Sequence, residues 1–338
     1  MQLGLLMFPS PRGSADVARL LEELGFDSLV FADTQCLTPE VWSQLMLAAT
    51  ATDRIEIGPG VTNPVSRDAA VTASAAVGLQ IASGGRVVLG IGRGDSSMAK
   101  IGKRPAPPAE FERYLERLRG YMDGEVVDRD GHESRLEWLD ECEVPYVPIE
   151  VAATGPKVID LAARRADRIC FAVGADLDRL RTSIARARMA AEAAGRRPDA
   201  LELGAYVNCV VHPDRSVARQ AIRGGLASFA TFSGFAGMDL ETLPEGVRDA
   251  ARHLRQSYDM THHGKASSEH AQSIDDDFVH RFGIAGPVEE AVERFAALRD
   301  LGLDFVRVVP GSRDMDTAVR VQSVQAIAKH VLPAVASR

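Results

Sequence analysis

Short apolar runs alternate with amphipathic stretches along most of the chain. Residues 2–8 form the first apolar run, and residues 14–24 follow with apolar side chains at helical spacing. The alternation predicts strands at residues 2–8, 28–32, 54–57, 86–91, 149–153, 168–172, 201–211 and 305–309. It predicts helices at residues 14–24, 39–52, 68–81, 108–122, 156–165, 178–194, 216–229, 288–301 and 317–334. Buried strands that alternate with helices form a parallel sheet, and eight such units predict an α/β fold, a (β/α)8 TIM barrel.

Two segments interrupt this alternation. Residues 123–147 are acidic and contain two glycines, and residues 231–277 are rich in Gly, His, Ser and Asp. We interpret them as a surface excursion after strand four and an insertion after strand seven, within a single domain of residues 1–338. A doubly wound open sheet is the alternative, but the GxGxxG sequence typical of that fold does not follow the first apolar run.

Two features of the outer elements predict contacts. Aromatic side chains at the insertion could cover a ligand as a lid, or they could belong to a packed pair of surface helices: Phe229, Phe232, Phe235 and Tyr258. The predicted helices over 41–52 and 68–81 are apolar over much of their surface, whereas the outer helices of a barrel should be half polar. We therefore expect a subunit interface on this side and a homodimer.

Composition excludes several classes of protein. The 39 basic and 47 acidic residues give a net charge of −8, which argues against nucleic-acid binding because that needs a basic face. No apolar run reaches the length of a membrane span, and the N-terminus lacks the pattern of a signal peptide. The four cysteines are far apart and form no CxxC pair, so we expect neither disulfides nor a zinc site. A cytoplasmic location is the simplest expectation.

The active site of such a barrel lies where the strands end and the helices begin. Asp33 follows the second predicted strand, where it would either face the barrel mouth or cap a loop. After the third strand, residues 58–64 (GPGVTNP) indicate irregular backbone, and Gly60 permits dihedral angles that other residues resist. This segment is either a β-bulge that closes the barrel or backbone pressed against a flat ligand, and the two readings are compatible.

The segment after the fourth strand, residues 90–95 (GIGRGD), places Gly92 and Asp95 at the barrel mouth. Alternating glycines let backbone N–H groups converge on an anion or a ring. Three basic residues of the same loop could meet a phosphate or a polyanionic tail, or could simply be solvated: Lys100, Lys103 and Arg104.

Two small-residue turns follow strands five and six. Thr154 and Gly155 precede Pro156 at the start of a helix, where free N–H groups bind anions. Gly174 and Ala175 form the adjacent turn, and the pair of turns could cradle one phosphate. No HExxH metal motif and no GxSxG nucleophile motif is present, so we expect no metal. A glycine-lined site without a nucleophile fits an enzyme whose cofactor carries the reaction.

Several of these segments resemble the bacterial luciferase-like superfamily. They are residues 58–64 (GPGVTNP), 70–75 (AVTASA), 83–95 (SGGRVVLGIGRGD), 152–156 (AATGP) and 281–286 (RFGIAG). Within that superfamily the chain most resembles the branch that contains coenzyme F420-dependent methylenetetrahydromethanopterin reductase. The resemblance spans nearly the whole chain and is most specific over residues 55–95.

The resemblance implies a deazaflavin or isoalloxazine ring in the barrel mouth. It implies a non-prolyl cis peptide bond at Gly60–Val61, and it places Asp33 near the reactive edge of the ring. The implied cofactor contacts are Gly60, Val61, Thr62, Gly92, Asp95, Thr154, Gly155, Gly174 and Ala175. The reductase has a Glu in strand one near the position of Leu6 in this chain. The resemblance therefore implies the cofactor class of the reductase for this chain, but not its pterin substrate.

Three functions are compatible with these observations. The first is an F420-dependent oxidoreductase, in which a hydride passes between the deazaflavin and a small organic substrate while Asp33 or Asp95 orients the substrate or relays a proton. The second is an FMN-dependent monooxygenase supplied by a partner flavin reductase, with His262 or His263 as its base. The third is a flavin-binding barrel without catalysis, which the glycines at the mouth disfavour because they leave space for a ligand.

Overall fold

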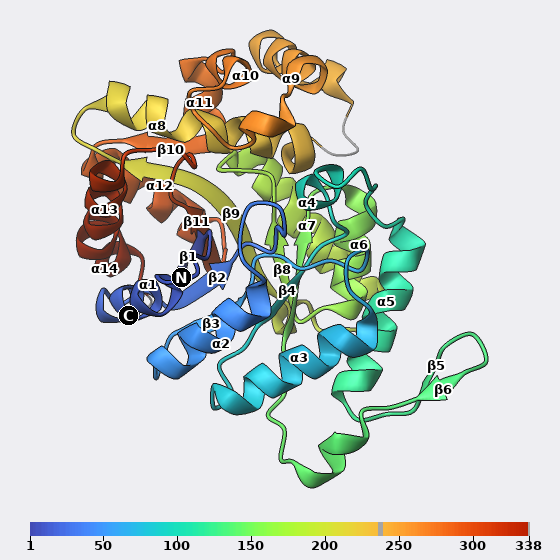
Figure 1. Cartoon of the computed structure of the whole chain (residues 1–338). Coiled ribbons are helices and arrows are strands. Elements are labelled where there is room, and N and C mark those ends of the chain that lie inside the picture. Colours follow the sequence, from blue (N-terminus) through green and yellow to red (C-terminus); the bar gives the residue numbers. More distant parts are fainter. Residues whose placement is uncertain (236–238, 337–338) are drawn as a thin grey trace.

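The computed structural model describes residues 1–235 and 239–336, so residues 236–238 of the insertion and the last two residues of the predicted domain lie outside the description. Eight parallel strands form the barrel, in the order β3-β2-β1-β11-β9-β8-β7-β4 (Figure 1). Their bounds are Gln2–Met7 (β1), Ser28–Phe31 (β2), Glu56–Pro59 (β3), Leu89–Ile91 (β4), Ile149–Ala153 (β7), Arg168–Phe171 (β8), Glu202–Val211 (β9) and Phe305–Val309 (β11). The bridges Ile57–Val87 and Thr62–Ile91 join the two ends of the sheet and confirm the predicted barrel.

A ring of helices surrounds these strands. The helices are Ser14–Glu23 (α1), Val41–Ala51 (α2), Ala69–Ala82 (α3), Pro108–Met122 (α5), Pro156–Arg165 (α6), Leu177–Ala193 (α7), Arg215–Ser228 (α8), Val288–Asp300 (α12) and Thr317–Ala326 (α13). The chain is helical over the predicted last helix, residues 317–334, but the helix is not regular throughout. A π-helical turn at Ile327–Val331 precedes a last turn, Leu332–Val335 (α14), in which Pro333 has no N–H to continue the ladder. No helix among the described residues is long and apolar enough to cross a membrane.

The excursion after β4 carries a two-stranded hairpin that projects from the barrel in Figure 1. Its strands are Val127–Asp128 (β5) and Glu133–Ser134 (β6), followed by a 3-10 helix at Glu137–Glu141. A short helix that the sequence did not predict, Ser96–Ala99 (α4), lies in the loop directly after β4.

The insertion after β9 is mostly helical. After a π-helical turn at Phe229–Gly234, it forms Glu245–Ser257 (α9), Glu269–Gln272 (α10) and Asp276–Phe282 (α11), and short 3-10 turns lie at Leu240–Thr242 and Met260–His262. These elements gather at the top of Figure 1 around their own apolar cluster, which includes Leu254, Phe278 and Phe282. An additional parallel strand, Gly283–Gly286 (β10), then pairs with β9 and returns the chain to the barrel.

A buried charge network fills the barrel near the amino ends of the strands. The Arg307 guanidinium, only 1% exposed, lies 2.8 Å from Glu150 and 3.0 Å from Glu56. Arg168 extends the network with a 2.8 Å contact to Glu56. Because Arg307 is in register with Tyr206 of β9, this network lies directly beside the side chain that reaches into the cavity at the barrel mouth.

The seam between β3 and β4 depends on direct backbone contact. A Cβ atom at Gly58 would lie 1.9 Å from the Val88 carbonyl oxygen, and one at Gly90 would lie 2.1 Å from the Pro59 carbonyl oxygen. Real side chains never approach backbone so closely, so only glycine at both positions lets the two strands meet.

We therefore expect Gly58→Ala to weaken closure of the barrel and to lower the free energy of unfolding by about 3 kcal/mol. Urea unfolding followed by circular dichroism measures this change. The matched control is Gly246→Ala in α9, where the nearest atom to an added Cβ is 3.7 Å away. That helix position should tolerate alanine or gain stability. Equal unfolding free energies for wild type and Gly58→Ala would contradict the role of the seam.

Candidate active site

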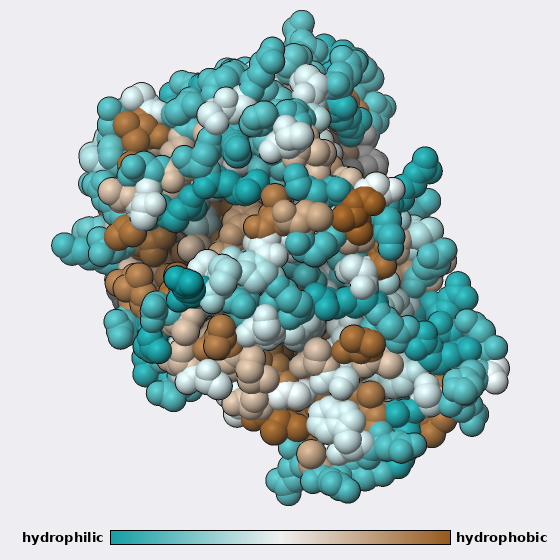
Figure 2. Space-filling view, viewed as in Figure 1, coloured by the Kyte–Doolittle hydropathy of each residue, from teal (hydrophilic) through white to brown (hydrophobic). Residues whose placement is uncertain are grey.

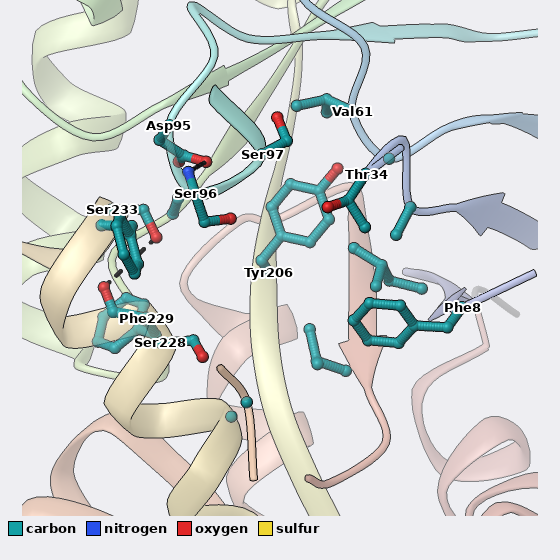
Figure 3. A pocket seen from close by; sticks show the side chains of 18 of the residues that line it. Phe8, Thr34, Val61, Asp95, Ser96, Ser97, Tyr206, Ser228, Phe229 and Ser233 are labelled. Carbon is teal, nitrogen blue, oxygen red and sulfur yellow. Dashed lines mark hydrogen bonds between the residues drawn. The ribbon is translucent and has the colours of Figure 1, made fainter. Parts of the chain in front are cut away.

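Two adjoining cavities occupy the carboxyl ends of the barrel strands. The first has a volume of about 250 Å³, and the second of about 400 Å³. They share wall residues that include Val61, Asp95, Ala152 and Phe232, so they form one continuous site between the barrel and the insertion. Figure 3 shows the first cavity, with the Tyr206 ring standing between Phe8 on one side and Ser228 and Phe229 on the other.

Asp33 lies in the wall of the first cavity and is held by two partners. Its carboxylate accepts a 2.8 Å hydrogen bond from Thr62 Oγ1 and two 3.3 Å bonds from the Arg67 guanidinium. Arg67 also donates to Glu40 at 2.9 Å. Asp33 is only 7% exposed, so this geometry makes it a buried, paired charge that fixes Thr62 at the seam.

The backbone after β3 forms one side of both cavities. The peptide bond between Gly60 and Val61 is cis, as the family resemblance implies. Gly60 and Val61 line the first cavity, and Val61, Thr62 and Gly92 line the second. A Cβ at Gly60 would lie 2.6 Å from Val30 Cγ2, so the backbone there packs directly onto β2. The chain thus presents a flat wall of backbone and small side chains to the site.

Asp95 stands where the two cavities meet. It caps α4, and its Oδ1 accepts a 2.5 Å hydrogen bond from the Ser96 N–H. Asp95 is an exposed residue whose carboxylate opens onto both cavities. The protein atoms packed around the carboxylate raise the pKa of Asp95 above its ordinary value, against the opposing effect of the Ser96 hydrogen bonds.

The far end of the second cavity can bind an anion. Thr154 and Gly155 lie there at the start of α6, and no side chain caps that helix. Arg93 and Lys157 line the same cavity. A free helix N-terminus together with two cations is suited to a phosphate.

Other residues predicted for the phosphate contact lie elsewhere. Ala175 donates its N–H to the Phe282 carbonyl, and a Cβ at Gly174 would lie 2.7 Å from that same oxygen, so this turn packs against the insertion. Lys100 donates to the Met260 carbonyl at 2.6 Å and thereby links the loop after β4 to the insertion. Lys103 and Arg104 are exposed and absent from the described walls of both cavities.

The two adjacent histidines of the insertion differ in their surroundings. His262 is exposed, and its Nδ1 lies 2.6 Å from the Asp259 carboxylate, so its ring is outside the described walls of the site. His263 is 8% exposed and lines the first cavity. Burial, and then the positive charges of Arg313, Lys100 and His270, lower the pKa of His263 to about 4. It is therefore a neutral imidazole at pH 7.

Two polar residues of β9 were missed at the level of sequence. Tyr206 and Asn208 both line the first cavity, and the Tyr206 hydroxyl and Asn208 Oδ1 are buried without a partner among the described residues. Burial raises the pKa of Tyr206, so its hydroxyl stays protonated and can donate. The available signal was the pair of polar residues two positions apart in an otherwise apolar strand, which places both side chains on one face. Orphaned buried polar groups are costly, and a bound ligand would satisfy them.

The aromatic side chains of the insertion divide into two groups. Phe229 and Phe232 line the first cavity, whereas Phe235 is fully buried against Phe229, Phe278 and Phe282. The insertion is thus a packed helical element, and part of its aromatic surface faces the site.

Comparison with known proteins identifies the family. The chain matches the model of the luciferase-like monooxygenase family over residues 4–304. It is 31% identical to 5,10-methylenetetrahydromethanopterin reductase of Archaeoglobus fulgidus, over 93% of each protein.

Solved structures share the fold. The coenzyme F420-dependent tetrahydromethanopterin reductase of Methanopyrus kandleri aligns with a TM-score of 0.78, at 21% identity over 99% of both chains. The oxygenating constituent of 3,6-diketocamphane monooxygenase from Pseudomonas putida, solved with FMN, aligns with a TM-score of 0.68, at 18% identity over 99% of both chains. The chain therefore belongs to the luciferase-like family, as an enzyme of the class that comprises F420-dependent oxidoreductases and luciferase-like monooxygenases.

Proposed function

We propose that this enzyme is an F420-dependent oxidoreductase that reduces or oxidises a small organic substrate in the first cavity. The observation that carries the proposal is the division of the site into a flat, small-residue middle and a cationic far end. F420 has the matching parts, a planar ring followed by a phosphate and an acidic oligoglutamate tail. The 31% identity to an archaeal reductase over nearly the whole chain supports the same cofactor class.

The residues of the site fit such a cofactor. The ring would lie against the Gly60–Val61 backbone and above the small side chains of Ala152 and Ala172, which line both cavities. The phosphate would meet Thr154 and the uncapped N-terminus of α6. When bound, the deazaflavin supplies the hydride donor or acceptor that the protein itself lacks.

The first cavity would then hold the substrate. Its walls include apolar side chains on opposite sides, among them Leu6, Phe8 and Phe232. The resemblance implies that the reductase carries an acid in strand one near the position of Leu6, so we propose a substrate other than the pterin. Tyr206 and Asn208 offer a donor and an acceptor for a polar group on an otherwise apolar molecule.

We also propose a homodimer formed through α2 and α3. Both helices carry large apolar side chains on the outer surface, Met46 and Leu47 on α2 and Val71 and Ile81 on α3, with exposed fractions from 38% to 58%. Figure 2 shows brown and tan side chains over these two helices. Several large apolar side chains exposed on one side of a protein are typical of a subunit interface.

F420 should bind more tightly than FMN, and its affinity should fall as salt rises, because the tail is anionic. Fluorescence quenching of each cofactor by the purified protein measures both affinities. Lys157→Ala should weaken F420 binding about tenfold, the loss expected for one charge-assisted contact. Lys329→Ala, an exposed change at the far C-terminal helix, should leave the affinity unchanged. Tight FMN binding with weak, salt-insensitive F420 binding would instead support a monooxygenase fed by a flavin reductase.

The dimer has its own test. Wild-type protein should show twice the chain mass of 36.4 kDa in light scattering at micromolar concentration. Leu47→Glu should shift the mass toward one chain, because it places a charge in an apolar contact. A monodisperse monomer in the wild type would contradict the proposed interface.

A further inference from the structure

Three side chains of the insertion and α8 form a continuous chain of hydrogen bonds that ends at the first cavity. Ser228 Oγ lies 2.8 Å from the Tyr258 hydroxyl, and that hydroxyl lies 2.7 Å from His263 Nδ1. The Gly264 N–H donates to the same Tyr258 oxygen at 3.3 Å. Ser228 and His263 both line the cavity, so the chain runs along its wall (Figure 3 labels Ser228).

The second ring nitrogen of His263 is the end of this chain. Nε2 has no hydrogen-bond partner among the described residues. It is also not fully buried, so a molecule can reach it. The ring is packed edge-on against Phe232 and Tyr258, with centroid distances of 5.5 and 5.8 Å, and these contacts fix its orientation. Nε2 is thus the ring nitrogen of His263 that remains open to a molecule in the cavity.

We propose that His263 is the residue that exchanges a proton with the substrate, and that Tyr258 and Ser228 supply this proton through His263 Nδ1. The inference rests on the proposed function, because a carbonyl that gains a hydride on carbon also needs a proton on oxygen. It identifies His263 as the residue that gives or takes this proton. It also specifies the substrate class, an apolar molecule with a carbonyl or hydroxyl group that reaches Nε2.

The direction of the hydrogen bond between the Tyr258 hydroxyl and His263 Nδ1 decides whether Nε2 is a donor or an acceptor toward the cavity. A neutral imidazole carries a single proton. When the Tyr258 hydroxyl donates to Nδ1, that proton resides on Nε2, and His263 is a donor toward the substrate. When Nδ1 donates to Tyr258, Nε2 is a bare acceptor. The Gly264 N–H occupies one lone pair of the Tyr258 oxygen, and Ser228 Oγ can donate either to Tyr258 or to the Gly224 carbonyl oxygen, which lies 3.2 Å away. Both directions of the Tyr258–His263 hydrogen bond are compatible with these contacts, and the first arrangement, with Ser228 as the donor to Tyr258, is the one in which His263 gives a proton to the substrate.

Burial of the ring, and then the positive charges around it, lower the pKa of His263 and keep the imidazole neutral. Arg313, which donates through its guanidinium to the His263 carbonyl at 2.8 Å, comes from the loop after β11. Lys100 approaches from the loop after β4, and His270 from α10. Tyr258 is the ionisable group in direct contact with the ring, and burial raises its pKa, against the hydrogen bonds from Ser228 and Gly264. His263 therefore acts by passing a proton on rather than by storing one as imidazolium.

In the reducing direction, a bound reduced deazaflavin would supply the hydride to the substrate carbon, and the carbonyl oxygen, whose π bond breaks, would need a proton. The carbonyl oxygen takes the proton from His263 Nε2, and Nδ1 takes the proton of the Tyr258 hydroxyl. Ser228 O–H and Gly264 N–H stabilise the resulting phenolate by donating to its oxygen. Water returns the proton to Tyr258, which is partly exposed. The alcohol oxidation follows the same steps in reverse.

The relay can be tested by nuclear magnetic resonance without cofactor or substrate, on protein labelled with ¹⁵N-histidine. His263 should stay neutral down to about pH 5, consistent with its pKa of about 4. Tyr258→Phe removes the partner of Nδ1 and should shift both ring nitrogens of His263 toward a different tautomer balance. Unchanged ¹⁵N shifts in a folded Tyr258→Phe variant would overturn the relay.

Kinetics with reduced F420, and with cyclohex-2-enone and acetone as carbonyl probes, test the catalytic role. His263→Gln should lower kcat about a hundredfold or more, the usual contribution of a general acid, while the Kd for F420 stays unchanged. The matched control is His253→Gln, an exposed histidine of α9 on the same insertion, which should behave as wild type.

The outcomes separate the two proposals. Wild-type kcat in His263→Gln would overturn the role of His263 and leave the cofactor assignment standing. A wild-type protein that binds no F420, or oxidises no reduced F420 with either probe, would count against the proposed function. The ¹⁵N comparison would still decide the relay in that case.

Discussion

The rest of the structure depends on backbone contact at the seam between β3 and β4. Glycines at 58 and 90 allow carbonyl groups of the facing strand to occupy the space of a side chain, and the barrel closes there. The Thr62–Ile91 bridge continues this contact to the barrel mouth. The same few residues therefore close the fold and form the flat wall of the site, so a change that opens the seam would also remove that wall.

Charge inside the barrel supports the site from below. The Arg307 network fills a volume that would otherwise need large apolar side chains, and each member has an oppositely charged partner, as buried charges require. Tyr206 lies beside this network, and its side chain lines the cavity above. The barrel thus forms the floor of the cavity, where the buried Tyr206 hydroxyl has no partner among the described residues.

The insertion completes the site from the opposite side. Its own apolar cluster makes it a packed unit, and Lys100 joins it to the loop after β4 across the mouth. The insertion contributes His263 and Phe232 to the wall of the first cavity. Phe232 lies in its first, π-helical turn. The flat backbone wall of the site and the wall formed by His263 and Phe232 therefore belong to different segments of the chain.

The sequence by itself determined the barrel, its element order and the loops that carry chemistry, because burial on both faces of a parallel strand leaves a continuous apolar run that is visible along the chain. It also pointed to Asp33, Asp95 and the Gly60–Val61 backbone, since these directly follow strands. It could not choose between His262 and His263, or show that Gly174 packs against Phe282. Those outcomes were decided only by the tertiary structure, because they depend on how the insertion, whose residues are distant in sequence from the barrel loops, packs against them.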